Sequence, residues 1–216
     1  MGEKQCVMNR RNLLAYSLRT LFVVTTSSTF FFGWLRTRVT AANRQRDLVQ
    51  QIERLGGHVG YRHEWDDKTN RVSKNGMPGP AMLRNFFGDH FFLTPSLILF
   101  SEFQGTDEDL EPIRHLKTVT HVGIVDSPNV RDGVIDWLIQ LPKLNDLSLY
   151  GTNVGSEAIL RLSSLRELTG ICVSHTLVDP IDLSRLQKVF ADCTIYLDNT
   201  EPRVSMSDIL AIIDDA

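Results

Sequence analysis

Residues 141–154 read LPKLNDLSLYGTNV, and this stretch decides the fold. Its apolar residues Leu147 and Leu149 are two positions apart, which is the spacing of side chains on one face of a strand. The residues that follow have helical spacing, and Ser156-Glu157 is suited to begin a helix. We therefore predict a strand followed by a returning helix.

The same residue types return along the second half of the chain. Moving 24 residues forward reproduces the pattern at Leu165, Leu168, Ile171, Val173, Thr176 and Val178, and moving 25 residues back reproduces it at Leu116, Val119, Val122, Ile124 and Ser127. A further step back gives Leu97, Leu99, Leu110 and Ile113. One strand–helix unit cannot bury its apolar side alone, so the units must stack. We expect parallel strands near 97–100, 122–125, 147–150, 171–174 and 195–198.

This pattern, L-x-x-L-x-L-x-x-T-x-V followed by an amphipathic stretch, resembles the leucine-rich repeat of bacterial proteins over about residues 93–216. The resemblance implies an α/β solenoid with parallel strands on one face and helices on the other. It also implies a binding scaffold without catalytic residues. The basic head, from Arg10-Arg11 to Arg44-Gln45-Arg46, is similar to the amino-terminal membrane anchor of some bacterial members.

The charge of the chain is distributed unevenly. The 216 residues carry a net charge of −3. Residues 1–46 hold eight basic side chains and one acidic side chain, a net +7, so the remainder carries −10. An acidic body argues against nucleic acid as its partner. The three cysteines are too few for a disulfide framework.

The head also contains a long stretch without charge, Thr20–Leu35. A helix over residues 13–35 is about 34 Å long, enough for the ~30 Å hydrocarbon core of a bilayer. We predict a single-pass membrane helix there. Basic residues flank it on both sides, so the side of the membrane that holds the repeats is not indicated.

Two other interpretations of the head stay open. Val39-Thr40-Ala41 resembles a signal-peptide cleavage pattern, which would release a secreted or periplasmic binding domain near Ala41. A helix buried in a protein core would also be apolar.

The expected organisation is a basic flank and transmembrane helix over 1–35, a helical connector over 36–57, a small α+β cap over 58–92, and the repeat domain over 93–216. The connector places Ala41, Leu48, Ile52 and Leu55 on one face, which we expect to pack on the body. Dimerisation through residues 36–55 is the weaker alternative.

Residues that flank the inward pair of each strand should face outward. They form the predicted partner-binding surface: Phe100, His121, Val125, Asp146, Ser148, Tyr150, Cys172, Ser174, Tyr196 and Asp198. Exposed aromatic residues suit the centre of an interface. We expect a scaffold or adaptor, and not an enzyme, that binds a protein partner through this strand surface and through adjoining turns such as 126–129, 151–153 and 175–177.

Patterns for other chemistry are weak. Cys172 and His175 could form a nucleophile and base, but no oxyanion-binding feature accompanies them. His58 and His63 have opposite parity on a strand, which argues against a shared metal with Glu64. Asp107–Asp109 suits a helix start. No phosphate-binding or dinucleotide-binding glycine motif is present. We expect no catalytic residue, no metal and no cofactor.

Overall fold

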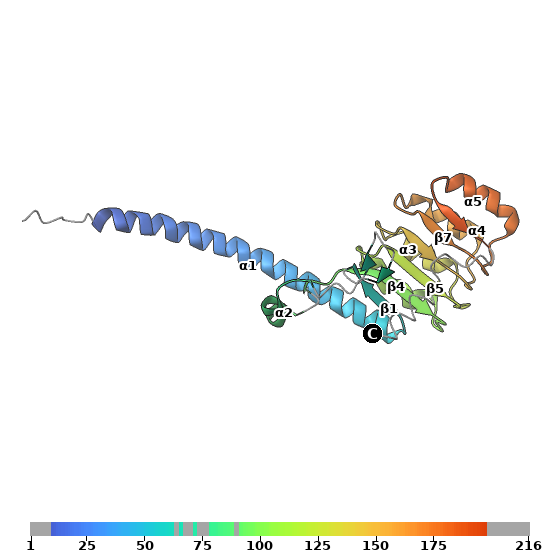
Figure 1. Ribbon diagram of the computed structural model, residues 1–216, viewed down its shortest axis with the longest axis horizontal. Coiled ribbons are helices and arrows are strands. Elements are labelled where there is room, and N and C mark those ends of the chain that lie inside the picture. Colours follow the sequence, from blue (N-terminus) through green and yellow to red (C-terminus); the bar gives the residue numbers. More distant parts are fainter. Residues whose placement is uncertain (1–9, 63–64, 67–70, 73–77, 89–90, 198–216) are drawn as a thin grey trace, which may run out of the picture. The chain divides into compact units, whose positions relative to one another are not determined.

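The structure is a computed structural model that describes residues 10–62, 65–66, 71–72, 78–88 and 91–197 (Figure 1). The chain divides into two compact units, Met1–Ala42 and Asn43–Ala216. The helix α1 (Arg10–Arg54) contributes residues to both. Each unit is described by itself below.

The second unit is built on one mixed sheet of six strands. The strands are β1 (His58–Tyr61), β4 (Pro95–Ser101), β5 (His121–Val125), β6 (Asp146–Ser148), β7 (Gly170–Cys172) and β8 (Thr194–Tyr196), in the order β1-β4-β5-β6-β7-β8. β1 is antiparallel to β4, and each later pair is parallel. A separate two-stranded sheet joins β2 (Trp65–Asp66) to β3 (Arg71–Val72).

Short helices connect the strands. They are α2 (Ala81–Phe87), the 3-10 helix η3 (Asp107–His115), η4 (Asp132–Val134) with α3 (Ile135–Leu138), α4 (Ser156–Arg161) with η5 (Leu162–Ser164), and η6 (Pro180–Asp182) with α5 (Leu183–Val189). The start of η3 is a capping box, in which Thr106 and Asp109 satisfy each other's backbone N–H groups. This agrees with the expected role of the acidic run 107–109.

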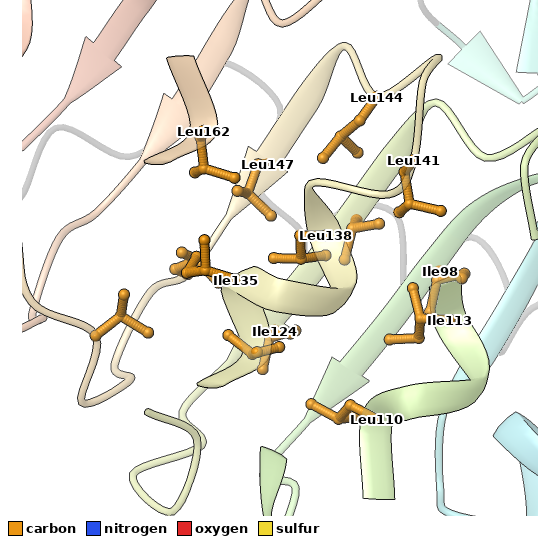
Figure 2. Close-up of a cluster of buried hydrophobic side chains, with 14 of the residues drawn as sticks. Ile98, Leu110, Ile113, Ile124, Ile135, Leu138, Leu141, Leu144, Leu147 and Leu162 are labelled. Carbon is orange, nitrogen blue, oxygen red and sulfur yellow. The ribbon is translucent and has the colours of Figure 1, made fainter. Parts of the chain in front are cut away.

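The hydrophobic core lies between the sheet and these connecting segments. Figure 2 shows strand residues meeting residues of the connections, each almost fully buried: Ile98, Ile124 and Leu147 from the sheet, and Leu110, Ile113, Ile135, Leu138 and Leu162 from the connections. Alternate positions of each strand therefore face this core, as the period of two predicts.

The last turns of α1 belong to the same core. Val49 and Ile52 are 2% and 0% exposed, and Leu48 and Leu55 pack against the cluster. The expected packing of the connector on the body is therefore confirmed for Leu48, Ile52 and Leu55, whereas Ala41 is exposed and belongs to the first unit. The apolar face of residues 43–54 packs against the core of the second unit. The helix α1 continues without a break through Ala41.

The predicted fold class, a leucine-rich repeat solenoid preceded by a membrane helix and a separate α+β cap, is wrong. The structure has one mixed sheet, because β1 from the expected cap pairs antiparallel with β4. Gly60 permits this pairing, since a Cβ there would lie 3.2 Å from the Leu97 side chain. The connecting helices are also short and partly of the 3-10 type.

The predicted single-pass membrane location is wrong as well. Within the described part of the chain, no helix combines the length and the apolar character needed to cross a bilayer. The sequence gives the reason, because the hydroxyl-bearing run Thr25–Thr29 interrupts the apolar stretch of α1. The side chains of that run bond to carbonyl groups of their own helix.

The five later strands lie where the repeat places them, but β4 is shifted by one residue. Ile98 pairs with Val122 and Phe100 with Ile124, whereas the sequence spacing aligned Leu97 and Leu99 with those residues. Because side chains alternate between faces, this shift places Ile98 and Phe100, rather than Leu97 and Leu99, on the core side of the sheet. Leu99, on the other side, is also buried, at 2% exposed. Ile98 and Phe100 are 0% and 1% exposed and lie in the core.

A residue with a left-handed backbone conformation follows each of the four successive strands β4–β7, within three residues of the strand end. The φ angles are +53° at Glu102, +49° at Asp126, +65° at Gly151 and +55° at His175. The N–H groups of Glu102, Asp126 and Gly151 bond to the carbonyl groups of Val125, Tyr150 and Ser174 in the next turn. The chain therefore leaves each of these strands in the same backbone conformation. Hydrogen bonds join the end of one strand to the end of the next.

Gly151→Ala should destabilise the second unit by about 1–2 kcal/mol, because a left-handed residue with a Cβ is strained. The new Cβ would also lie 2.7 Å from Asp126 Oδ1 and 3.1 Å from its Cα. Urea unfolding followed by circular dichroism measures the loss. Gly155→Ala is the matched control, since its Cβ would meet Asp132 only at 3.7 Å. An equal loss in both variants would contradict the prediction.

Candidate functional site

The candidate site is the face of β5–β8 opposite the hydrophobic core, which we call the outer face. It carries His121 and Val125 from β5, Asp146 and Ser148 from β6, Cys172 from β7, and Thr194 and Tyr196 from β8. Asp146, Thr194 and Tyr196 are exposed, and His121, Val125 and Ser148 are partly so. The face therefore joins polar and aromatic side chains on a rigid sheet.

A chain of polar groups crosses the centre of the outer face. Asp146 Oδ2 lies 3.3 Å from His121 Nε2, and Thr120 Oγ1 lies 2.7 Å from His121 Nδ1. The Thr120 hydroxyl is also 3.1 Å from the Ser96 carbonyl oxygen. Both ring nitrogens are thus engaged, which fixes the orientation of the imidazole.

Gly170 provides the space for Asp146. A Cβ at Gly170 would clash with Asp146 Oδ1, so only glycine lets the carboxylate lie across the neighbouring strand. The polar cluster therefore joins His121 of β5 to Asp146 of β6, and Gly170 of β7 leaves the room that the Asp146 carboxylate occupies. Its half-exposed imidazole and carboxylate can accept or donate hydrogen bonds to a partner.

An aromatic pair lies beyond the end of β6, four residues after Asp146 along the chain. The Tyr150 and His175 rings meet edge to face, with centroids 4.9 Å apart. His175 thus packs on Tyr150, while the Cys172 thiol lies 3.9 Å from Ser174 Oγ. Cys172 is 8% exposed and Ser174 is 4% exposed. The arrangement does not present Cys172 and His175 as a nucleophile with its base.

The turns next to the outer face are tied to each other. Asn129 donates to the Gln104 carbonyl at 2.9 Å, and Asn153 donates to the Pro128 carbonyl at 2.6 Å. Ser127 Oγ accepts the Phe103 N–H, whereas Thr152 Oγ1 bonds within its own turn, to the Leu149 carbonyl. These bonds hold the loops in fixed positions, which suits recognition without large rearrangement.

The predicted partner-binding residues fall into three groups. His121, Val125, Asp146, Ser148, Tyr150 and Tyr196 lie on the outer face or its edge with at least part of their surface accessible. Phe100, Cys172 and Ser174 are buried, so their side chains are not accessible to a partner in this structure. Asp198 lies outside the described residues.

Sequence reasoning assigned the turn 175–177 to the partner-binding surface but could not show what its residues contact. The His175 ring completes the pair with Tyr150. Leu177 is 65% exposed in the same turn. The sequence indicates the exposure of Leu177, because Leu177 lies between the repeating residues Thr176 and Val178, where alternation turns the side chain outward.

Among the residues that the structure describes, no group of three or more His, Cys, Asp or Glu side chains is placed to hold a metal ion. His63 and Glu64 lie outside those residues. Asp107 has a structural role, because its carboxylate accepts the N–H groups of Arg131 at 2.7 Å and Gly133 at 3.0 Å. These bonds link η3 to the start of η4.

Burial, and secondarily the charge of Asp146, raises the pKa of the Cys193 thiol from 9.0 to about 11. The thiolate is the reactive form. The alkylation rate at Cys193 should therefore keep rising with pH up to about 11, while folded-state stability falls from about pH 9 upward. Iodoacetamide labelling of the folded chain, read by peptide mass spectrometry with glutathione alongside, tests this. A plateau of the Cys193 rate near pH 9 would contradict it.

Comparison with known proteins gives little. No protein family and no curated protein matches the sequence. Among solved structures, the chain is similar to one described as "Structure of Chaetomium Mex67:Mtr2 subunits", with 17% identity and a TM-score of 0.39. The match covers 54% of this chain and 88% of that chain. A likeness at this level supports no conclusion about fold or function, so no family is assigned.

Proposed function

We propose that the second unit is a non-catalytic module that binds a protein partner through the outer face and its adjoining turns. One observation supports this most. The rings of Tyr150 and His175 form an accessible aromatic pair just after the ends of β6 and β7, the His121–Asp146 pair lies on β5 and β6, and the other face of the sheet is packed. Aromatic residues bordered by polar groups are typical of interface centres.

The size of the surface indicates which parts must take part. Four strands spaced ~4.8 Å apart span about 14 Å, and exposed positions along about 17 Å of each strand then give the outer face an area of roughly 240 Å². A standard interface covers about 800 Å² of each partner. The turns must therefore contribute, and 151–153 and 175–177 are placed to do so. Leu177, 65% exposed, offers an apolar contact beside the aromatic pair.

The proposed recognition has two components. An apolar side chain of the partner packs on Tyr150 and Leu177, since burial of such contacts supplies most of the affinity. The His121–Asp146 pair orients the partner by hydrogen bonds and selects against a purely apolar surface. No step in this recognition requires a reacting group.

Site-specific photo-crosslinking in the full chain tests the proposal. A photoreactive residue at Ser148 should give a discrete crosslinked protein, whereas the same residue at the exposed Ser163, on the helical side, should not. Adding Tyr150→Ser should remove the Ser148 product while circular dichroism shows an unchanged fold. Identical products from both positions, or a Ser148 product unaffected by Tyr150→Ser, would refute the proposal.

A further inference from the structure

The sheet of the second unit ends at β8. Within the residues that the structure describes, β8 pairs with β7 on one side and with no strand on the other. The helix α5 lies at the same end of the unit, next to α4, and Arg185 of α5 forms an ion pair with Glu157 of α4 (Figure 1). We call this end of the unit, formed by β8 and α5, the open end. Folded proteins usually cover such an edge, because it can pair with other chains.

Apolar side chains at the open end are less covered than their equivalents in the preceding units. Three positions are 0% exposed one unit earlier, at Ile159, Ile171 and Val173. Their equivalents 24 residues later are only partly buried: Leu183, Ile195 and Leu197. Val189 is 47% exposed, whereas Leu141, the equivalent residue two units earlier, is 0% exposed. Covering these side chains would remove apolar surface from water and stabilise the unit.

The opposite end of the sheet shows how this chain covers a core. There β1 pairs antiparallel with β4, and α1 packs Val49 and Ile52 onto the same core. A helix from the chain's own sequence, with apolar residues on one face, therefore closes that end. Among the described residues, no segment does the same at the open end.

The sequence that follows β8 carries apolar residues at helical spacing. Four large ones fall on a single face of a helix: Met206, Ile209, Leu210 and Ile213. The acidic residues Asp208 and Asp215 fall on the other side. Ser205, with Asp208 three residues later, matches the pattern that begins a helix. Residues 205–213 thus have the sequence of an amphipathic helix with one face to bury.

We propose that residues 205–213 cover the open end of the same chain as a helix. Its apolar face packs on Leu183, Ile195 and Leu197. The connecting residues 198–204 can span about 23 Å when extended, which exceeds the ~10 Å between packed layers. Pro202 lies within this connection and has no N–H to donate to a sheet. The helical spacing and Pro202 both favour a covering helix over a further strand.

The covalent connection favours this occupant over a second copy. A segment joined through a short linker reaches its site at an effective concentration in the millimolar range. A second copy must instead be recruited from solution. It would also bring together two bodies that each carry a net charge of −10 over residues 47–216, and like charges repel.

Amide hydrogen exchange of the full chain is the first test. A helix of this length is marginal by itself in water, so residues 205–213 are protected only when they pack on the body. Their amide protons should exchange at least about tenfold more slowly than those of a free peptide with the same sequence. Exchange at the rate of the free peptide would overturn the proposal.

Two matched substitutions test the apolar face. Ile209→Asp places a charge in that face, so exchange in residues 205–213 should rise to the free-peptide rate and exchange in β8 should also become faster. Ala211→Asp is the control, because Ala211 lies on the polar side and its replacement costs more helix propensity. Protection should remain in this control. Equal results for the two variants, including no effect of either, would contradict the proposed packing.

Photo-crosslinking in the purified full chain identifies the occupant. Gln187 is exposed and, two residues after Arg185, lies on the opposite side of α5 from the ion pair with α4. A photoreactive residue at Gln187 should crosslink to residues 205–213 in a product of monomer mass, as peptide mass spectrometry can show. The same residue at the exposed Glu108 of η3 should not. A product of dimer mass alone, or no crosslink to 205–213, would overturn the proposal.

Discussion

Phe100→Ala should destabilise the second unit by about 3–5 kcal/mol, the usual cost of removing a buried phenylalanine. The Phe100 side chain is 1% exposed and its ring meets Phe103 edge to face at 5.1 Å. The surrounding core includes Ile52 of α1, so the cavity would open where the helix and the sheet join. Urea unfolding followed by circular dichroism measures the change.

Tyr150→Ala is the control for this prediction. Tyr150 and Phe100 look equivalent in the sequence spacing, yet Tyr150 is partly exposed and lies at the outer face. Its replacement should cost less than about 1.5 kcal/mol of stability. Similar losses for the two variants would show that the assigned register of β4 is incorrect.

Gly57→Ala should have the second large effect, lowering stability by about 1–3 kcal/mol through overpacking. A Cβ at Gly57 would lie 2.6 Å from the ring of Phe100 and 2.7 Å from Ile52 Cγ2. Both neighbours are almost fully buried, so neither can move aside into solvent. Thermal unfolding should show the lower midpoint.

A double-mutant cycle identifies the cause of that loss. Phe100→Leu removes ring atoms that the new methyl group would meet, so Gly57→Ala should cost less in the Phe100→Leu background than in the parent. Contacting residues couple in this way, whereas distant ones add independently. Strict additivity would show that the Gly57 effect comes from the backbone and not from contact with Phe100.

Much of the second unit could be predicted from apolar spacing. Leu147 and Leu149, and their equivalents Ile171 and Val173, are buried as the period of two requires. Spacing could not fix the register of β4, because Leu97, Ile98, Leu99 and Phe100 are all apolar and either alternate pair could face the core. Pairing with β5 decides between them, and that is a long-range contact.

The candidate site could also be predicted only in part, because alternation along a strand shows which side chains share a face but not which of them touch. Alternation placed His121, Asp146, Ser148 and Tyr150 on the outer face. It could not show that the Asp146 carboxylate approaches the His121 ring on the adjacent strand or that His175 packs on Tyr150, because both contacts depend on neighbouring units being stacked. Burial of Cys172 and Ser174 also results from stacking.

The strand–helix alternation of residues 93–197, the parallel order of its strands and the basic charge of the first 46 residues can all be predicted from the amino-acid sequence. These features follow from local periodicity and composition. Long-range packing is needed to place β1 antiparallel to β4, to bring Ile52 of α1 into the core and to turn Phe100 inward. Those outcomes depend on which apolar faces meet in space, and a repeating pattern leaves more than one pairing open until the faces pack.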